Sequence, residues 1–341
     1  MATAGVLQIH PSLRCNLRCH HCYSSSGPDR RGVLGDDVLA DLVSDAAALG
    51  YATLAVSGGE PLMFPGLEAL LRAAREAGMR TMVTTNGTLV TPRRLAELAP
   101  LLDLLAFSLD GPPDVHNAVR AVPWAFAKLD RGLAVAAREG LPHGVLYTAT
   151  TRSVGHIGWA SDFAAGHGCA LFQIYALEDE GRAGEELCGQ LLGRSLLDET
   201  ARAGVEARVA HAPGLRVHVD LARRSELDGL TSGGVLGPAG QPPILVVEAD
   251  GAVVPMTHGL DRGLQVATLG GERLRDALPR FLDDRSAALG ALVDTTVADL
   301  LASDLATFDV YAELRRASRR HAPVVGTGGE TVGETPVALP A

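Results

Sequence analysis

The stretch VLQIHPSLRCNLRCHHC, residues 6–22, joins a short apolar run directly to three closely spaced cysteines. The run 6–10 predicts a β-strand, so the cysteines fall in the loop that leaves its carboxyl end. Their spacing, C-x3-C-x2-C, allows Cys15, Cys19 and Cys22 to bind one metal centre together. Three thiolates can hold three corners of a cubane iron–sulfur cluster, and the fourth iron then remains open to another ligand.

Two other interpretations fit the cysteines taken by themselves. A structural zinc site needs four nitrogen or sulfur ligands, and one of His10, His20 and His21 could be the fourth. No second CxxC or HxxxH pair follows in the sequence, however. Three unrelated free thiols are the other alternative, but three of the chain's five cysteines lie within eight residues. The spacing therefore favours a cluster over zinc, and chance explains it poorly.

The composition excludes several classes of protein. The chain of 341 residues has a formal net charge of −10, and only 4% of its residues are aromatic. Such a chain is a poor candidate for binding nucleic acid or an anionic membrane surface. No apolar stretch is long enough to span a bilayer, and the first ten residues lack the pattern of a signal peptide. Disulfides are therefore not expected, and the sequence predicts a cytoplasmic protein.

Short apolar runs alternate with amphipathic segments along the first half of the chain. Six strand–helix units in a row predict a parallel sheet with right-handed crossovers, as in an open or closed α/β barrel. The expected strands are 6–10, 53–57, 81–87, 104–111, 144–150 and 170–177, and the expected helices are 36–49, 66–77, 91–99, 124–140 and 154–167.

Polar or glycine-rich motifs follow the first four of these strands. In α/β barrels the loops at the carboxyl ends of the strands build the active site. The sequence therefore predicts one shared site, formed by the cysteine loop, Gly58-Gly59-Glu60-Pro61, Asn86, and the pair Ser108 and Asp110.

A second region begins near residue 180. A helix is expected over 184–209, a strand over 215–221, a β-hairpin over 244–256 around Ala249-Asp250-Gly251, and a helical stretch to residue 320. The tail 322–341 is rich in Gly, Thr and Pro and is expected to be loosely attached. The predicted division is a barrel domain over 1–180, a small α+β domain over 181–321, and the tail.

Four motifs together resemble those of radical S-adenosylmethionine (SAM) enzymes: CNLRCHHC (15–22), SGGEP (57–61), TTNG (84–87) and SLDG (108–111). The resemblance covers roughly residues 5–180 and implies a partial (βα)6 barrel. It implies that Cys15, Cys19 and Cys22 hold one [4Fe–4S] cluster whose open iron chelates SAM. Reductive cleavage of SAM would then give methionine and a 5′-deoxyadenosyl radical, which takes a hydrogen atom from the substrate.

The resemblance also implies a set of contacts to the methionine part of SAM. Gly58 and Gly59 would let the backbone approach the ammonium group, and Glu60 would pair with it. Ser108 and Arg120 would grip the carboxylate, for which the arginine fork is suited. A plain glycine turn and a surface arginine are the alternatives for these positions.

Further contacts to the adenosine part are implied in the same way. Asn86 and Asp110 would bind the ribose or line the substrate pocket, with turn formation or capping as the alternative. His21 would lie near the adenine, where the family usually has an aromatic residue. Leu177, at the end of the sixth strand, would offer the adenine a backbone contact.

Residues 247–271 weakly resemble the hairpin of peptide maturases that carry an additional cluster domain, DGxVxPC followed by LG. Met256 stands where that pattern has its cysteine. Only Cys169 and Cys188 remain outside the triad, and an auxiliary cluster needs more thiolates than these two. The resemblance therefore implies a SPASM/twitch-like domain that lacks its cluster ligands, with an ordinary hairpin as the alternative.

Three residues are candidates for catalysis beside the cofactors. His258 lies where related maturases place an acid or base, and histidine moves protons near neutral pH. Cys169 and Cys188 could donate a hydrogen atom to a substrate radical. An exposed loop histidine and inert buried cysteines are the commoner situations.

The resemblance to the maturase branch implies a ribosomally synthesised peptide as substrate, in natural-product biosynthesis. Because ligands for an auxiliary cluster are missing, a redox-neutral outcome such as epimerisation, rearrangement or methyl-type transfer is expected, or else return of the electron to the first cluster. A small-molecule intermediate is the first alternative, and a non-catalytic, zinc-stabilised binding protein is the second. The expected partners are a flavodoxin- or ferredoxin-type electron donor and a separate leader-peptide-binding protein, because the first strand starts too early for a leader-binding domain to precede it.

Overall fold

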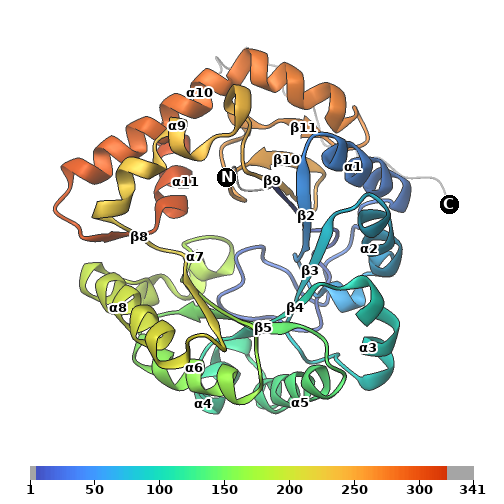
Figure 1. The fold of residues 1–341 in the computed structure, drawn as a ribbon, viewed down its shortest axis with the longest axis vertical. Coiled ribbons are helices and arrows are strands. Elements are labelled where there is room, and N and C mark those ends of the chain that lie inside the picture. Colours follow the sequence, from blue (N-terminus) through green and yellow to red (C-terminus); the bar gives the residue numbers. More distant parts are fainter. Residues whose placement is uncertain (1–4, 321–341) are drawn as a thin grey trace.

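A single curved sheet organises the chain, as seen in a computed structural model that describes residues 5–320 (Figure 1). Its ten strands lie in the order β11-β10-β9-β1-β2-β3-β4-β5-β6-β7. All neighbours from β9 through β7 are parallel, whereas β9–β10 and β10–β11 are antiparallel. The sheet bends into an open ring with helices around its outside (Figure 1).

One face of most of the parallel strands packs into the hydrophobic core, and the other face is buried to a smaller degree. In β4, for example, Leu105, Phe107 and Leu109 are fully buried in the hydrophobic core, while Ser108 between them is half-buried. The parallel strands are β1 (Gly5–Ile9), β2 (Tyr51–Val56), β3 (Arg80–Thr85), β4 (Leu104–Leu109), β5 (His143–Ala149), β6 (Leu171–Ala176), β7 (Arg216–Val219) and β9 (Ile244–Val247).

The core lies between the outer face of the sheet and the helices that cover it. Helix α2 is a clear case, because Leu67, Leu70, Leu71 and Ala74 follow a helical spacing and are all buried. The helices of this layer are α1 (Asp36–Ala48), α2 (Leu67–Glu76), α3 (Pro92–Leu98), α4 (Pro113–Arg120), α5 (Ala125–Arg138), α6 (Ile157–Gly166) and α8 (Arg194–His211).

The predicted α/β barrel architecture is confirmed, and the six strands and five helices expected before residue 180 are present with small shifts of their ends. Helix α4 was not predicted. It begins directly after Gly111-Pro112, a pair that indicates a turn, and it is only 8 residues long.

The second region adds to both edges of the same sheet. Strand β7 pairs with β6, and the predicted hairpin forms β9 and β10 (Ala252–Pro255), with β9 pairing with β1 at the opposite edge. Strand β11 (Ala267–Thr268), helix α10 (Leu274–Ala302), strand β12 (Thr307–Phe308) and helix α11 (Val310–Arg320) complete this region, with β12 paired to β8 (Ala222–Arg223). The sheet thus continues across residue 180, and the domain division drawn there stays a prediction.

The predicted tail, 322–341, lies outside the described residues. Within residues 5–320, no helix has both the length and the apolar character that a membrane crossing requires.

Candidate active site

The cysteine loop starts at the carboxyl end of β1 and is anchored by a buried arginine. Cys15 and Cys19 are buried and Cys22 is half-buried, and all three are free thiols. Arg182, on α7 (Arg182–Glu186), donates from Nε to the Cys19 carbonyl at 2.9 Å and from Nη2 to the Ser26 carbonyl at 2.7 Å. These bonds fix the backbone that carries the three sulfurs.

Each sulfur has a hydrogen-bond donor directed at it. The Cys15 sulfur lies 3.5 Å from the Leu17 amide and 3.8 Å from Asn86 Nδ2. The Cys22 sulfur lies 3.3 Å from the backbone amide of Ser26. Arg120 Nη1 lies 3.9 Å from the Cys19 sulfur. Donors of this kind stabilise thiolates bound to a metal, so the sulfurs and their surroundings fit an iron–sulfur cluster.

In residues 5–320, no group of three or more His, Cys, Asp or Glu side chains converges as a site for one metal ion. A zinc site requires its ligands to meet at a single ion within about 2.0–2.3 Å. A cubane needs no such convergence, since its thiolates bind different irons.

Burial makes the free thiols poor acids. It raises the pKa of Cys15 to about 12 and also raises that of Cys19. A metal centre must be bound by thiolates, so its binding has to displace these protons.

Gly58 and Gly59, which follow β2, pack against the cysteine loop. Gly58 has a positive φ of +98°, and a Cβ on Gly59 would lie 2.2 Å from the Arg14 carbonyl oxygen. The Gly59 amide donates to the Ser12 carbonyl at 2.9 Å. The two glycines therefore bring two strand-end loops together, a role in addition to the approach to SAM that was predicted.

Glu60 holds the loop after β3 in place through hydrogen bonds. It is only 2% exposed, and its carboxylate accepts hydrogen bonds from the Leu62 amide at 3.0 Å, Thr85 Oγ1 at 2.8 Å and the Asn86 amide at 2.9 Å. Asn86 in turn donates to Asn16 Oδ1 at 3.0 Å. Glu60 and Asn86, which were both predicted to contact SAM or the substrate, thus hold the loops after β1, β2 and β3 together in this structure.

Asp110, at the end of β4, is the centre of a buried polar cluster. Arg120 on α4 donates to it twice, from Nε at 2.6 Å and from Nη2 at 3.1 Å. His21 Nε2 lies 3.0 Å from Asp110 Oδ1, and His116 Nδ1 lies 3.1 Å from Oδ2. Burial opposes ionisation, but the charge of Arg120 and the two histidines hold the pKa of Asp110 well below its usual range.

The arginine fork that was predicted to grip the SAM carboxylate is therefore occupied by Asp110. Ser108, its predicted partner, is half-buried on β4.

His21 keeps its Nδ1 buried without a partner among the described residues, which fits a ring placed to meet a ligand. Leu177, after β6, is buried, and its amide already donates to the Ala149 carbonyl at 2.9 Å.

A second polar cluster joins the cysteine loop to the β9–β10 hairpin. Tyr23 Oη lies 3.2 Å from His10 Nε2, and the Tyr23 ring packs on His258 with centroids 4.4 Å apart. His258 Nε2 lies 3.0 Å from Glu178 Oε2, just after β6. Desolvation lowers the pKa of His10 to about 3, whereas His258 lowers that of Glu178 to about 2 against the effect of burial.

Arg315 on α11 continues this cluster. It is only 2% exposed, donates to Thr257 Oγ1 at 2.7 Å, and lies 3.5 Å from Glu178 Oε1 and 3.7 Å from Glu180 Oε1. The structure thus confirms nothing about catalysis by His258 but places it among charged groups. Tyr23, Glu178 and Arg315 were missed from the sequence, since no motif connects residues this far apart.

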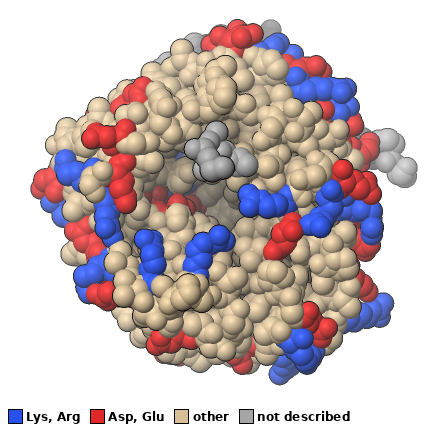
Figure 2. Space-filling view, viewed as in Figure 1, with Lys and Arg blue, Asp and Glu red and all other residues tan. Residues whose placement is uncertain are grey.

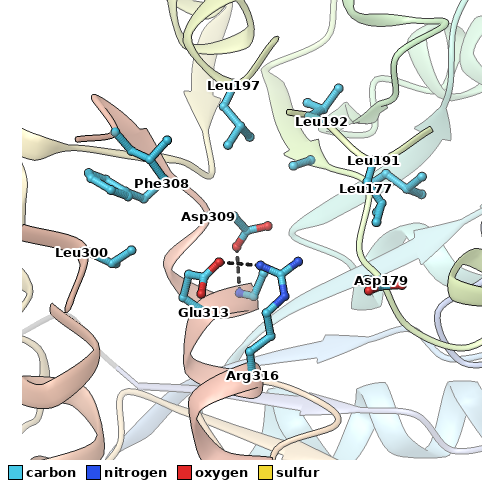
Figure 3. A pocket seen from close by; sticks show the side chains of 13 residues that line it. Leu177, Asp179, Leu191, Leu192, Leu197, Leu300, Phe308, Asp309, Glu313 and Arg316 are labelled. Atoms are coloured by element: carbon cyan, nitrogen blue, oxygen red, sulfur yellow. Dashed lines mark hydrogen bonds and ion pairs between the residues drawn. The ribbon is translucent and has the colours of Figure 1, made fainter. Parts of the chain in front are cut away.

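Two more carboxyl groups lie near this cluster. Burial together with Asp309 raises the pKa of Asp220, after β7, to about 7, and burial raises the pKa of Asp309 itself. Asp309 also borders an apolar pocket together with Leu177 and Phe308 (Figure 3). In the view along the ring, Figure 2 shows a central hollow with acidic side chains on its wall.

The remaining predicted residues lie apart from these clusters. Cys169 is buried just before β6, at the opposite end of that strand from Leu177, and burial raises its pKa to about 12. Cys188 is exposed in the short helix Cys188–Gln190. Met256 packs into the main hydrophobic core.

A comparison with protein families decides how the cysteine loop is classified. Residues 9–159 match the model of the radical SAM superfamily, from the end of β1 to the start of α6. Over these residues, which are less than half of its length, the chain is similar to radical SAM enzymes. That superfamily implies a [4Fe–4S] cluster and SAM, which fits the sulfur surroundings described above.

Among curated proteins, the chain is similar to the AdoMet-dependent heme synthase of Methanosarcina barkeri (strain Fusaro / DSM 804). The two are 31% identical over 174 residues, which is 50% of each chain. It is also similar to the GTP 3′,8-cyclase of Synechococcus sp. (strain CC9902), at 40% identity over 112 residues, 31% of this chain and 32% of that one. The matched regions thus span half or less of these relatives.

Solved structures share the fold over a larger part of the chain. Streptococcus suis SuiB bound to S-adenosylmethionine superposes with a TM-score of 0.67 at 16% identity, covering 84% of this chain and 68% of that one. The enzyme anSMEcpe with bound AdoMet and the Kp18Cys peptide superposes with a TM-score of 0.63 at 20% identity, covering 85% and 83%. At these identities the similarity concerns the fold alone.

Proposed function

We propose that this chain is a radical SAM enzyme, which cleaves SAM reductively and abstracts a hydrogen atom from a substrate held inside the open ring. The observation that carries the proposal is the cysteine loop, with three sulfurs that each face a hydrogen-bond donor at the carboxyl edge of the sheet. Cys15, Cys19 and Cys22 would hold one [4Fe–4S] cluster. Bound there, the cluster supplies the electron that splits SAM into methionine and a 5′-deoxyadenosyl radical.

The chain's own residues would position SAM and exclude water. Gly58 and Gly59 set the backbone of the loop beside the cysteines, while Glu60 and Asn86 lock that loop to β3. The unpartnered Nδ1 of His21 would meet the adenosine part. Such loops hold the reacting groups in place and keep solvent away from a reactive radical.

His258 is the proposed acid or base for the substrate. Glu178 Oε2 lies 3.0 Å from its Nε2, so the carboxylate can orient the ring. Tyr23 and His10 extend the hydrogen-bonded cluster toward the cysteine loop. A proton removed from or delivered to the substrate would pass through His258. Cys188 and Cys169 contribute less to this proposal, since neither belongs to that cluster.

A ribosomally synthesised peptide is the substrate class we propose first. The superposition with SuiB, which has also been solved with its precursor peptide SuiA, extends over 85% of this chain and thus includes elements after residue 180. A peptide substrate would need the electron donor, of flavodoxin or ferredoxin type, and a leader-peptide-binding partner. A small molecule is the second candidate, favoured by sequence relatives such as Fe-coproporphyrin III synthase of Methanosarcina barkeri, 34% identical over 143 residues.

The proposal is tested with anaerobically reconstituted protein, dithionite and SAM. Release of 5′-deoxyadenosine by the wild type, and none by a C15A/C19A/C22A variant, is expected. Deuterated candidates then separate the substrate classes: a perdeuterated candidate peptide, and a deuterated porphyrin as the small-molecule candidate. Deuterium in 5′-deoxyadenosine from the peptide supports the first candidate, and deuterium from the porphyrin alone overturns it. Absence of 5′-deoxyadenosine from a loaded enzyme contradicts the reaction itself.

A further inference from the structure

Arg120 uses all three of its guanidinium nitrogens on two partners. Nε and Nη2 donate to the two carboxylate oxygens of Asp110 at 2.6 and 3.1 Å, and Nη1 lies 3.9 Å from the Cys19 sulfur. Both side chains are buried, with Arg120 at 6% and Asp110 at 1% exposure. A planar guanidinium held bidentately on one side has its remaining N–H groups aimed in a fixed direction on the other.

Asp110 is itself held from several sides. Its carboxylate has His21 Nε2 at 3.0 Å and His116 Nδ1 at 3.1 Å, in addition to Arg120. His116 is fully buried on α4 and packs edge-on against Phe126, with ring centroids 6.0 Å apart. Because α4 carries both His116 and Arg120, this short helix contacts Asp110, at the end of β4, through two of its side chains.

Cys19 differs from the other two cysteines in the charge of its donor. The donors to the Cys15 and Cys22 sulfurs are neutral amide or hydroxyl groups. The second buried arginine of this loop, Arg182, donates to backbone carbonyls at Cys19 and Ser26. Among the hydrogen bonds to these three sulfurs in the described part of the chain, the one at Cys19 alone comes from a cation.

We infer that Asp110 is a positioning residue that holds the Arg120 guanidinium against the Cys19 sulfur, and that this contact raises the reduction potential of the cluster. The inference rests on the proposed cluster at Cys15, Cys19 and Cys22. Reduction adds one negative charge to the cluster, so a cation and an N–H···S bond at a ligand sulfur stabilise the reduced form. Burial strengthens this interaction because little water screens it.

The test is a redox titration, followed by electron paramagnetic resonance, of reconstituted enzyme without SAM. Arg120→Met removes both charge and donor, whereas Arg120→Gln removes the charge and keeps an N–H donor. Both variants are expected to lower the equilibrium constant for one-electron reduction of the cluster. The decrease for Arg120→Met should be about tenfold, which corresponds to a reduction potential lower by ~59 mV. Arg120→Lys keeps the charge and should restore most of the potential. Arg202→Met, at an exposed arginine paired with Glu206, should leave it unchanged.

The role of Asp110 is tested by a double-mutant cycle. If Asp110 positions the guanidinium, the shift caused by Arg120→Gln becomes smaller in an Asp110→Asn background, and an equal shift in both backgrounds refutes that role. Unchanged potentials in loaded Arg120 variants overturn the inference while the proposed function stands. If the wild type binds a cluster and the variants Arg120→Met, Arg120→Gln and Arg120→Lys all fail to bind one, Arg120 has a structural role. That result also overturns the inference. A wild type that takes up no iron contradicts the proposed function instead.

Discussion

Replacing Gly59 with alanine tests whether the motif after β2 is needed to build the cysteine loop. A Cβ at this position would lie 2.2 Å from the Arg14 carbonyl oxygen and 2.7 Å from the carbon of the same carbonyl. These neighbours are backbone atoms and cannot rotate away, so the two loops must separate.

The expected cost follows from two terms. Overpacking of this kind costs about 1–3 kcal/mol. Separation also weakens two backbone hydrogen bonds, from Gly59 to Ser12 and from Glu60 to Arg14, each 2.9 Å long. Such bonds contribute about 0.5–1.5 kcal/mol each. Gly59→Ala should therefore lower the free energy of unfolding by about 2–6 kcal/mol.

Urea unfolding of the cluster-free protein measures this loss, and iron content after reconstitution reports on the loop. Gly158→Ala is the matched control, since Gly158 lies in α6 and a Cβ there would have no heavy atom within 4 Å. This control should gain up to about 1 kcal/mol from helix propensity and bind iron normally. A Gly59→Ala protein within about 0.5 kcal/mol of the wild type, and with full iron, would refute the reasoning.

Three further results are expected from the polar clusters. Arg315→Met removes a buried cation beside the half-buried Glu178 and Glu180, of which Glu180 keeps Arg319 at 2.7 Å, and should cost about 1–3 kcal/mol in urea unfolding, against less than about 0.5 kcal/mol for the exposed Arg202→Met. Burial beside Asp309 raises the pKa of Asp220 to about 7, so the folded state binds the extra proton and wild-type stability falls as pH rises from about 4 to 7. Asp220→Asn removes this fall. The variant should be more stable than the wild type by about 4 kcal/mol at pH 8 and equal to it near pH 4, and parallel pH profiles would contradict the assignment. His258→Gln should slow product formation by about 10²–10⁴-fold while 5′-deoxyadenosine is still released, and unchanged product formation would remove His258 from the mechanism.

The sheet could be predicted from the sequence because the strands are short apolar runs separated by helices and glycine-rich turns. The strands before residue 180 were predicted within a few residues, and so was the hairpin around Asp250-Gly251. The sharing of one edge by the cysteine loop, Glu60, Asn86 and Asp110 also followed from parallel topology alone.

Contacts made by side chains across the fold could not be predicted in this way. Glu60 and Arg120 were expected to face SAM, yet each already has protein partners, because the preferred rotamer depends on neighbours from other strands. Arg182 and Arg315 carry no motif, and their partners lie up to 163 residues away. Helix α4 escaped notice because the prolines at its start also indicate a turn.

The account depends most on one cluster held by Cys15, Cys19 and Cys22. Iron and acid-labile sulfide per chain, measured after anaerobic reconstitution, test this directly. The expected result is about four of each, retained by a C169A/C188A variant and lost from the C15A/C19A/C22A variant. Three results would contradict this claim of one cluster: zinc in place of iron, iron near eight per chain, or a cluster that survives without the three cysteines.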